Sequence, residues 1–357
     1  MSYRIQKKRC MQGQKRQEFM ICIILAVYNG ERFLRECLES LRNQTISELQ
    51  FILIDDGSTD SSGRICEEYA KNDSRFSVVH TENRGLCKAR ETGIGIAAER
   101  GAKYIGFVDC DDWLEPDMYQ VLLTSAEEAG ADIAECGYYT EYPDLTQTWL
   151  PGVSGANAGE ALYDLLKGAS HDYAWNKLWK TELFVGFRFP LDGPYADDMG
   201  VTWRIYTRVR TVTGVRKPLY HYRQVKTSIV HTNNTNLVNR WRVALDRYNG
   251  LWGQPKALMT DAQWNQVRKN QLRSCVFIAG KNMLYWLEYP KDQREKLHDK
   301  LQEMSRFVRK NIPLFGQDDW ELPLRLCSFL LRYPNKISYL IAHGVNVLTS
   351  GQKKTMY

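Results

Sequence analysis

The first 140 residues of this 357-residue chain alternate between apolar runs of strand length and amphipathic runs of helix length, and this alternation constrains the fold more than any other feature. We expect strands at Ile21–Val27, Leu49–Ile54, Phe76–His80, Tyr104–Val108 and Asp132–Tyr138, with helices at Glu31–Asn43, Ser61–Asn72, Leu86–Arg100 and Asp117–Ala129. Repeated strand–helix–strand units with short connections predict an α/β fold with a Rossmann-like, mostly parallel, doubly wound sheet.

The pattern changes in the second half of the chain. Between about 140 and 160 it breaks into Pro, Gly, Thr and Ser, which indicates a loop at a change of module. A further strand is expected at Lys217–Tyr222. Apolar residues recur at helical spacing over 237–310, and the segment 323–349 is apolar with scattered basic residues. A C-terminal helical extension is therefore predicted.

Composition narrows the classes of function. The formal net charge of +6 is too small to argue for nucleic-acid binding, although it suits an anionic ligand or an anionic membrane surface. The nine cysteines are odd in number and show no paired spacing, which favours a reducing, cytoplasmic compartment. The basic first 20 residues lead into no signal-peptide apolar region, and no stretch of about 20 apolar residues predicts a membrane-spanning helix.

An acidic cluster, Asp109-Cys110-Asp111-Asp112, directly follows a predicted buried strand. Three carboxylates on so short a loop repel one another, and a cation relieves that repulsion. Mg²⁺ and Mn²⁺ prefer such oxygen ligands and are often shared with substrate phosphates. The alternative, a solvated acidic turn, is less compatible with the position of the cluster at a strand end.

Three weaker clusters follow. Asp55-Asp56-Gly57-Ser58 is either turn chemistry or a carboxylate that accepts a hydrogen bond from a nucleobase N–H. The pair Asp197-Asp198 is either a helix start or the site of a base that deprotonates an acceptor hydroxyl. Arg223, after the strand Lys217–Tyr222, is suited to binding phosphate oxygens.

Together these motifs resemble the family 2 glycosyltransferases, inverting enzymes of the GT-A fold. The matching segments, in the family's order and at its spacing, are Leu25-Ala26-Val27-Tyr28-Asn29, Ile54-Asp55-Asp56-Gly57-Ser58-Thr59-Asp60, Glu82-Asn83-Arg84-Gly85, Ala89-Arg90 and Phe107-Val108-Asp109-Cys110-Asp111-Asp112-Trp113-Leu114. The match is specific over residues 20–138. It continues more weakly through Trp175-Asn176-Lys177-Leu178, Asp197-Asp198 and Tyr222-Arg223-Gln224.

The resemblance implies roles for individual residues. The nucleotide-sugar donor, most commonly a UDP-sugar, would contact Ala26, Val27, Tyr28, Asp55, Asp56, Asn83, Gly85, Arg90, Asp109, Cys110, Asp111, Arg223 and Ser228. A Mn²⁺ or Mg²⁺ cofactor would be held by Asp109, Asp111 and Asp112, and the catalytic base would be Asp198. The acceptor, a glycan or a lipid-linked oligosaccharide, would lie near Trp175, Lys177 and Asp197.

The chain departs from the family pattern at three of these positions. Ala26 stands where the family usually has Pro, Asp197 where it has Glu, and Cys110 where it has a small Ser. The change at Asp197 affects local acceptor contacts, whereas Cys110 should be tolerated because the middle side chain need not be a ligand.

The predicted organisation is a basic tail over 1–19, a GT-A domain over 20–232 and a helical region over 233–357. Within the GT-A domain, 20–138 would bind the nucleotide sugar and 139–232 the acceptor. The C-terminal segment could contact the inner face of the cell membrane, pack on the helical region or form a dimer contact.

Other readings of the same residues remain open. A sugar-nucleotide nucleotidyltransferase would also need a metal near a nucleotide, but a basic, glycine-rich loop is expected after its first strand, where this chain has Tyr28-Asn29-Gly30-Glu31-Arg32. A non-catalytic nucleotide- or sugar-binding protein would not need Asp198. A glycoside hydrolase is disfavoured by an α/β sheet with a metal cluster.

Overall fold

A ten-stranded sheet forms the centre of the computed structural model. Eight strands follow the order β3-β2-β1-β4-β9-β6-β10-β5, and the other two are β7, which pairs with β6, and β8, which pairs with β10. The structure describes residues 21–152, 156–190, 196, 198–224, 236–254, 256–284, 291–311 and 329–331. The strands are β1 (Ile21–Val27), β2 (Leu49–Asp55), β3 (Phe76–His80), β4 (Tyr104–Asp109), β5 (Trp113–Leu114), β6 (Ile133–Glu141), β7 (Thr146–Trp149), β8 (Ala156–Asn157), β9 (Lys177–Lys180) and β10 (Thr211–Arg223). Strands β1 to β4 pair in parallel, as do β6 and β10.

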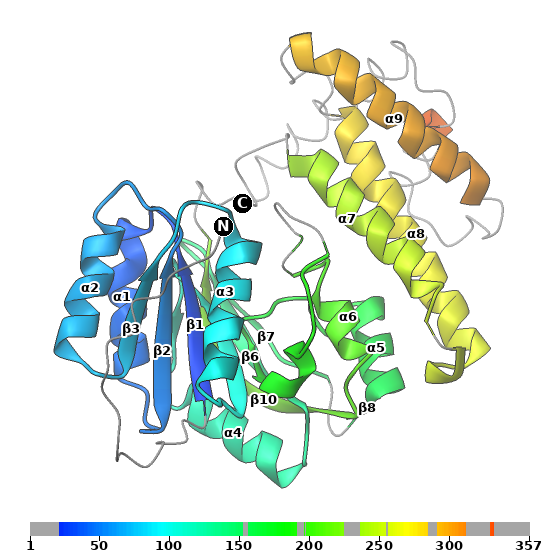
Figure 1. The fold of residues 1–357 in the computed structure, drawn as a ribbon. Helices are drawn as coiled ribbons and strands as arrows, with labels where there is room; N and C mark the ends of the chain where they lie inside the picture. Colours follow the sequence, from blue (N-terminus) through cyan, green and yellow to red (C-terminus); the bar gives the residue numbers. More distant parts are fainter. Residues whose placement is uncertain are drawn as a thin grey trace.

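Helices cover both faces of this sheet (Figure 1). The helices of the sheet region are α1 (Glu31–Arg42), α2 (Ser62–Asn72), α3 (Leu86–Glu99), α4 (Met118–Glu128), α5 (Ala158–Lys167) and α6 (Thr202–Tyr206). Buried residues of α1, α2 and α4 form one core cluster, and buried residues of α3, α5 and α6 form another. This is the two-faced covering that a doubly wound sheet requires.

Strand β1 shows why both faces must be covered. Successive side chains of a strand point to opposite faces. Ile21, Ile23 and Leu25 accordingly lie in the cluster with α1, whereas Cys22 and Ile24 lie in the cluster with α3. The continuous apolar run therefore fills two cores, as its sequence predicted.

Helix α3 packs on β1 at close range. A Cβ atom added to Gly93 would lie 2.4 Å from Cγ2 of Ile24, closer than two carbon atoms can approach. Only glycine at this position lets the helix backbone come so near to the strand. The close packing fixes the side chains of α3 relative to the end of the neighbouring strand β4.

Three further helices follow the sheet: α7 (Asn236–Leu251), α8 (Asp261–Leu284) and α9 (Lys291–Asn311). Figure 1 shows them, in yellow to orange, as a group beside the sheet region, with α7 and α8 lying next to each other. They share a core cluster of their own. Val243 and Leu251 of α7 also belong to the cluster that contains Trp203 of α6, so α7 packs on the sheet region as well.

The predicted fold class is confirmed, and the predicted elements of the first half agree with the observed ones to within a few residues. Two features differ from expectation. The segment read as a loop between 140 and 160 contains the short strands β7 and β8. In addition, β9 lies between β4 and β6 and is antiparallel to both of them.

No helix within the described ranges is both long enough and apolar enough to cross a membrane. The predicted basic tail over 1–19 lies outside the described residues, and so does the segment 323–349 apart from residues 329–331.

Candidate functional site

Polar side chains from three neighbouring strands meet at the carboxyl edge of the sheet. In the register of the sheet, Val27 pairs with Asp55 and Ala26 pairs with Asp109, so the ends of β1, β2 and β4 lie side by side. The acidic motifs after β2 and β4 are far apart in the sequence but adjacent in space. Ligands of open α/β sheets commonly bind at this edge.

Arg90 of α3 contacts two predicted site residues, Asp109 of the acidic turn and the predicted base Asp198. Its Nη2 lies 2.9 Å from Oδ1 of Asp109, and its Nη1 lies 3.1 Å from Oδ1 of Asp198. The guanidinium is almost fully buried, at 2% exposure, whereas the side chains of Asp109 and Asp198 are 28% and 25% exposed. One buried cation thus holds two partly accessible carboxylates in the same place.

The acidic turn concentrates negative charge at this edge. Burial and the neighbouring charge of Asp109 raise the pKa of the Asp111 carboxyl to about 6. Burial, with Asp111 and Asp109 nearby, raises the pKa of the Asp112 carboxyl well above its usual range. The turn closes with a hydrogen bond of 3.1 Å from the Asp112 N–H to the Asp109 carbonyl.

The three acidic side chains do not have the same surroundings. Asp112 is buried, and it accepts hydrogen bonds from the Tyr220 hydroxyl at 2.7 Å and from the Arg223 N–H at 2.8 Å. The Tyr220 hydroxyl also accepts a hydrogen bond of 3.2 Å from the Asp109 N–H. Asp112 therefore ties the end of β10 to the acidic turn, while Asp109 and Asp111 are the more accessible pair.

Arg223 lies over the acidic turn. Its Nε donates to the carbonyl of Asp111 at 2.8 Å, and its Nη2 pairs with Glu36 of α1. The guanidinium lies 4.3 Å from the ring centre of Trp113 and 4.6 Å from that of Phe33. Stacking between two rings holds a cation beside the carboxylates, where it can meet an anionic ligand.

The carboxylates of the acidic turn can be compared with the ligands that a divalent cation needs. Among the residues that the structure describes, no three His, Cys, Asp or Glu side chains are grouped so as to hold a metal by themselves. A Mg²⁺ or Mn²⁺ ion needs fewer protein ligands when substrate phosphates supply the rest. Asp109 and Asp111 are hard oxygen donors in a region of excess negative charge, so they fit such an ion.

The predicted base pocket lies at the ends of β1 and β2. Asp55 is buried, and it accepts a hydrogen bond from the Ser58 N–H at 3.1 Å and contacts Nδ1 of His80 at 2.7 Å. Tyr28 is 51% exposed, which is unusual for so large a ring and leaves its face accessible to a ligand. The neighbouring Ala26 and Val27 are half-buried and buried.

Asp56 organises the loop that precedes α3. Its carboxylate is buried and accepts hydrogen bonds from the N–H groups of Arg84 at 3.0 Å and Gly85 at 2.7 Å, and from the Thr81 hydroxyl at 3.1 Å. Asn83 and Gly85 are exposed on this loop. Asp56 thus holds the loop that carries these two exposed residues.

Cys110 connects the acidic turn to the loop after β1. Burial raises the pKa of its thiol, and so do the neighbouring carboxylates of Asp111 and Asp109. A Cβ added to Gly30 would lie 2.8 Å from the Cys110 sulfur, so the two loops are in tight contact. The side chain in the middle of the motif is therefore a packing contact between loops.

Two predicted acceptor residues lie in the interior. Trp175 is stacked between Tyr173 and Tyr220, with ring centres 4.6 Å and 4.3 Å away. Lys177 is fully buried, and its Nζ donates to the carbonyls of His171 at 2.9 Å and Tyr173 at 2.8 Å. Buried side chains cannot contact an acceptor directly. Trp175 and Lys177 would therefore affect acceptor binding only by holding residues 171–173 in place. Asp197 and Ser228 lie outside the described residues.

Sequence reasoning missed three residues that shape the site. Tyr220 contacts Asp109 and Asp112, and Phe33 and Glu36 contact Arg223. Tyr220 lies three residues before Arg223 on the same strand, which is a weak signal. Phe33 and Glu36 sit on a predicted helix, and no local pattern relates them to a residue near position 220.

Comparisons of the sequence with known proteins find glycosyltransferases. The model of the family described as glycosyl transferase family 2 matches residues 22–184. The putative glycosyltransferase EpsH of Bacillus subtilis (strain 168) is 38% identical over 218 residues, which are 59% of this chain and 62% of that protein. Glycosyltransferase GlyG of Streptococcus pneumoniae serotype 4 is 31% identical over 226 residues, which are 60% of this chain and 73% of that protein. The match thus spans less than two thirds of the length of EpsH.

Solved structures show a similar fold. The crystal structure of S. aureus TarS 1–349 has a TM-score of 0.65 and 16% sequence identity, over 90% of this chain and 88% of that one. The same protein in complex with UDP-GlcNAc has a TM-score of 0.63 and 14% identity, over 90% and 89% of the two chains. The likeness extends beyond the sheet region and into the C-terminal helices, since it covers most of the chain.

Proposed function

This chain belongs to glycosyl transferase family 2, and from that premise we propose that it transfers a sugar from a nucleoside-diphosphate sugar to a hydroxyl group of a cell-surface glycan or its lipid-linked precursor. The observation that carries the proposal is the bridge made by Arg90. It brings Asp109, from the edge where a donor would bind, next to Asp198, which is suited to act as a base.

The donor side of the proposal rests on accessible groups at the carboxyl edge. Tyr28 offers an exposed ring for a nucleobase, and the buried carboxylates Asp55 and Asp56 lie at the end of the neighbouring strand β2. Asp109 and Asp111 would hold a Mg²⁺ or Mn²⁺ ion, which neutralises the charge of a departing diphosphate. Arg223 lies close enough to add a second positive charge there. UDP is the favoured nucleotide because the TarS structure of similar fold contains UDP-GlcNAc.

The proposed chemistry is a single displacement. Asp198 accepts the proton of the acceptor hydroxyl. The hydroxyl oxygen forms a bond to the anomeric carbon from the face opposite the diphosphate. The bond between that carbon and the phosphate oxygen breaks, and its electron pair leaves with the diphosphate. One displacement inverts the anomeric centre, and no covalent sugar–enzyme intermediate is needed.

The test is turnover of donors by the full chain. UDP-GlcNAc, UDP-glucose, UDP-galactose and GDP-mannose would each be incubated with Mn²⁺ and a panel of oligosaccharides, and release of nucleoside diphosphate measured. We expect at least one donor to be consumed. Asp198→Asn should lower kcat by about 10²- to 10⁴-fold, the usual contribution of a general base.

A matched control is Asp144→Asn, because Asp144 is an exposed carboxylate in the turn between β6 and β7. It should retain wild-type turnover. Full activity of Asp198→Asn would refute the assignment of the base, and binding of a nucleotide without any turnover would favour a non-catalytic binding protein.

A further inference from the structure

The loop over residues 170–174, between α5 and β9, reaches the proposed base. The N–H of Ala174 donates a hydrogen bond of 3.3 Å to Oδ1 of Asp198. This is the same oxygen atom that Arg90 contacts at 3.1 Å. The position of the Asp198 carboxylate therefore depends on where this loop holds its backbone.

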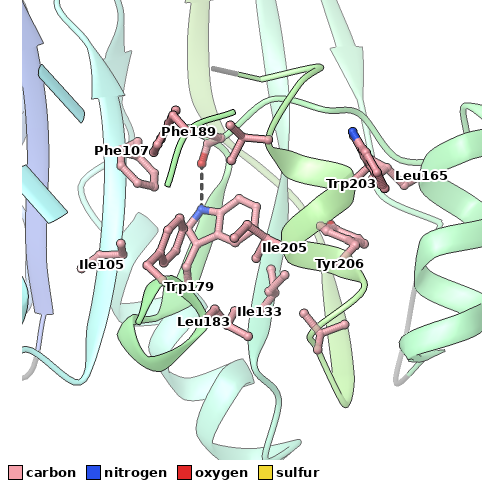
Figure 2. Packing of buried hydrophobic residues seen from close by; sticks show 14 of the residues in the cluster. Ile105, Phe107, Ile133, Leu165, Trp179, Leu183, Phe189, Trp203, Ile205 and Tyr206 are labelled. Atoms are coloured by element: carbon pink, nitrogen blue, oxygen red, sulfur yellow. Dashed lines mark hydrogen bonds between the residues drawn. The ribbon is translucent and has the colours of Figure 1, made fainter. Parts of the chain in front are cut away.

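The sheet side of the loop is held by buried donors. Lys177 of β9 donates to two carbonyls of the loop, those of His171 and Tyr173, and pairs with Glu135 of β6 at 3.3 Å. The indole N–H of Trp179 donates to the Ala174 carbonyl at 3.1 Å. Figure 2 shows Trp179 in the middle of the apolar cluster, with a dashed line that marks this hydrogen bond. Strand β9 thus holds the loop through three hydrogen bonds to its carbonyl groups.

The other side of the loop is held from the C-terminal helices. Nη1 of Arg247, in α7, lies 2.7 Å from Oδ2 of Asp172. Arg247 is buried, at 5% exposure. The carbonyl of Asp172 also accepts a hydrogen bond of 2.6 Å from the Thr202 hydroxyl of α6. Asp172 therefore contacts α6 through its backbone carbonyl and α7 through its side chain.

Helix α7 is packed tightly where this contact is made. A Cβ added to Gly250, one turn after Arg247, would lie 2.7 Å from Cη2 of Trp203 in α6. So close an approach is possible only for glycine, and it leaves the Arg247 side chain little freedom to move relative to α6. The pair with Asp172 is consequently a contact of fixed geometry.

We propose that Arg247 is a positioning residue for Asp198, acting through Asp172 and the 170–174 loop, so that α7 belongs functionally to the acceptor half of the enzyme. The inference rests on the proposed function of Asp198. A buried guanidinium without its partner is costly, so Arg247 and Asp172 hold each other in one arrangement. The loop then presents the Ala174 N–H to the Asp198 carboxylate at a set distance and angle. Misplacing a reacting group by about 1 Å can cost about 10²-fold in rate.

The test compares Arg247→Gln with Asp246→Asn in the full chain. Asp246 is the preceding residue of α7, and it forms an ion pair of similar length, 2.8 Å, with Arg204 of α6 instead of the loop. Hydrogen exchange of the Ala174 amide is the first readout, because it reports the loop whether or not the enzyme turns over. We expect exchange about tenfold faster in Arg247→Gln and unchanged exchange in Asp246→Asn.

The second readout separates positioning from donor binding. Arg247→Gln should lower kcat for the best donor by about 10- to 100-fold while its KM for that donor changes less than about twofold. Asp246→Asn should keep both values. Arg247→Lys, which retains the charge, should recover part of the rate. If Arg247→Gln does not fold, Asp172→Ala removes the same contact from the more exposed side of the pair.

Unchanged exchange and unchanged kcat in Arg247→Gln would overturn the inference, and so would equal effects of Arg247→Gln and Asp246→Asn. The failure of the proposed function looks different. In that case wild-type protein consumes no donor, and only the exchange experiment responds to the substitutions.

Discussion

Lys177 gives the sharpest test of the interior, because the sequence places it near an acceptor and the structure buries it completely. Its Nζ donates to three oxygen atoms, those of the His171, Tyr173 and Asn176 groups, at 2.8 to 2.9 Å. It also pairs with Glu135, and neither side chain is exposed. Lys177→Met would keep most of the side-chain volume and remove every one of these contacts.

The expected cost follows from what Lys177→Met leaves behind. Glu135 keeps its hydrogen bonds from Ser170 and Asn176 but loses its only described cationic partner. Removing one partner of a buried ion pair typically costs about 3–5 kcal/mol. Lys103→Met is the control, because the Lys103–Glu127 pair is 55% and 44% exposed and should be worth less than about 1 kcal/mol.

Urea unfolding measures this difference. We expect Lys177→Met to lower the free energy of unfolding by about 3–5 kcal/mol. The double variant Lys177→Met/Glu135→Gln should lose less than the single one, because it no longer buries an unpaired carboxylate. Equal destabilisation by Lys177→Met and Lys103→Met would refute the buried network.

Two pH predictions follow from the titratable groups Asp132 and His80. Burial opposes ionisation of Asp132, but hydrogen bonds from Arg210 and Lys180 outweigh it and lower the pKa of this carboxyl to about 2. Its contribution of about 2 kcal/mol is present above pH 4 and is lost as the pH falls toward 2, so the unfolding free energy of Asp132→Asn should depend less on pH in that range. Hydrogen bonds to Glu67 and Asp55 raise the pKa of His80, so this histidine stabilises the fold below its unfolded pKa near 6.5 and stops doing so as the pH rises through its folded pKa. Because His80 is half exposed, the effect should be below about 1 kcal/mol, and His80→Gln should flatten the pH dependence of unfolding above pH 6.

The first half of the fold is readable from the sequence because its information is local. Each strand is a short apolar run, and each helix carries an apolar stripe, so periodicity alone locates β1 to β4 and α1 to α4. The strand-end position of Asp109 follows from the same pattern. Its neighbours Ala26 and Val27 follow from the parallel topology.

Local patterns say much less about the second half. Strand β9 has the sequence Lys177-Leu178-Trp179-Lys180, and its lysines make it look like a surface segment. Lys177 is buried only because Glu135, 42 positions earlier, neutralises it. No periodicity reveals such a pair, and so the insertion of β9 between β4 and β6 was not predicted.

The assembly of the site is also non-local. Arg90 and Asp198 are 108 positions apart, and Asp172 and Arg247 are 75 apart. The motif resemblance assigned roles to Arg90 and Asp198 separately, but their contact depends on how closely α3 packs on β1. That closeness is due to Gly93, and no local sequence pattern shows that its backbone lies against Ile24.

The central claim is that one edge of the sheet holds two carboxylates with different duties, Asp111 for the donor and Asp198 for the acceptor proton. Calorimetric titration of UDP with Mn²⁺ into wild-type protein, Asp111→Asn and Asp198→Asn tests it directly. The account predicts that Asp111→Asn weakens binding by about tenfold or more, which is at least ~1.4 kcal/mol, and that Asp198→Asn binds within about twofold of wild type. Equal weakening in the two variants, or wild-type binding by Asp111→Asn, would contradict it.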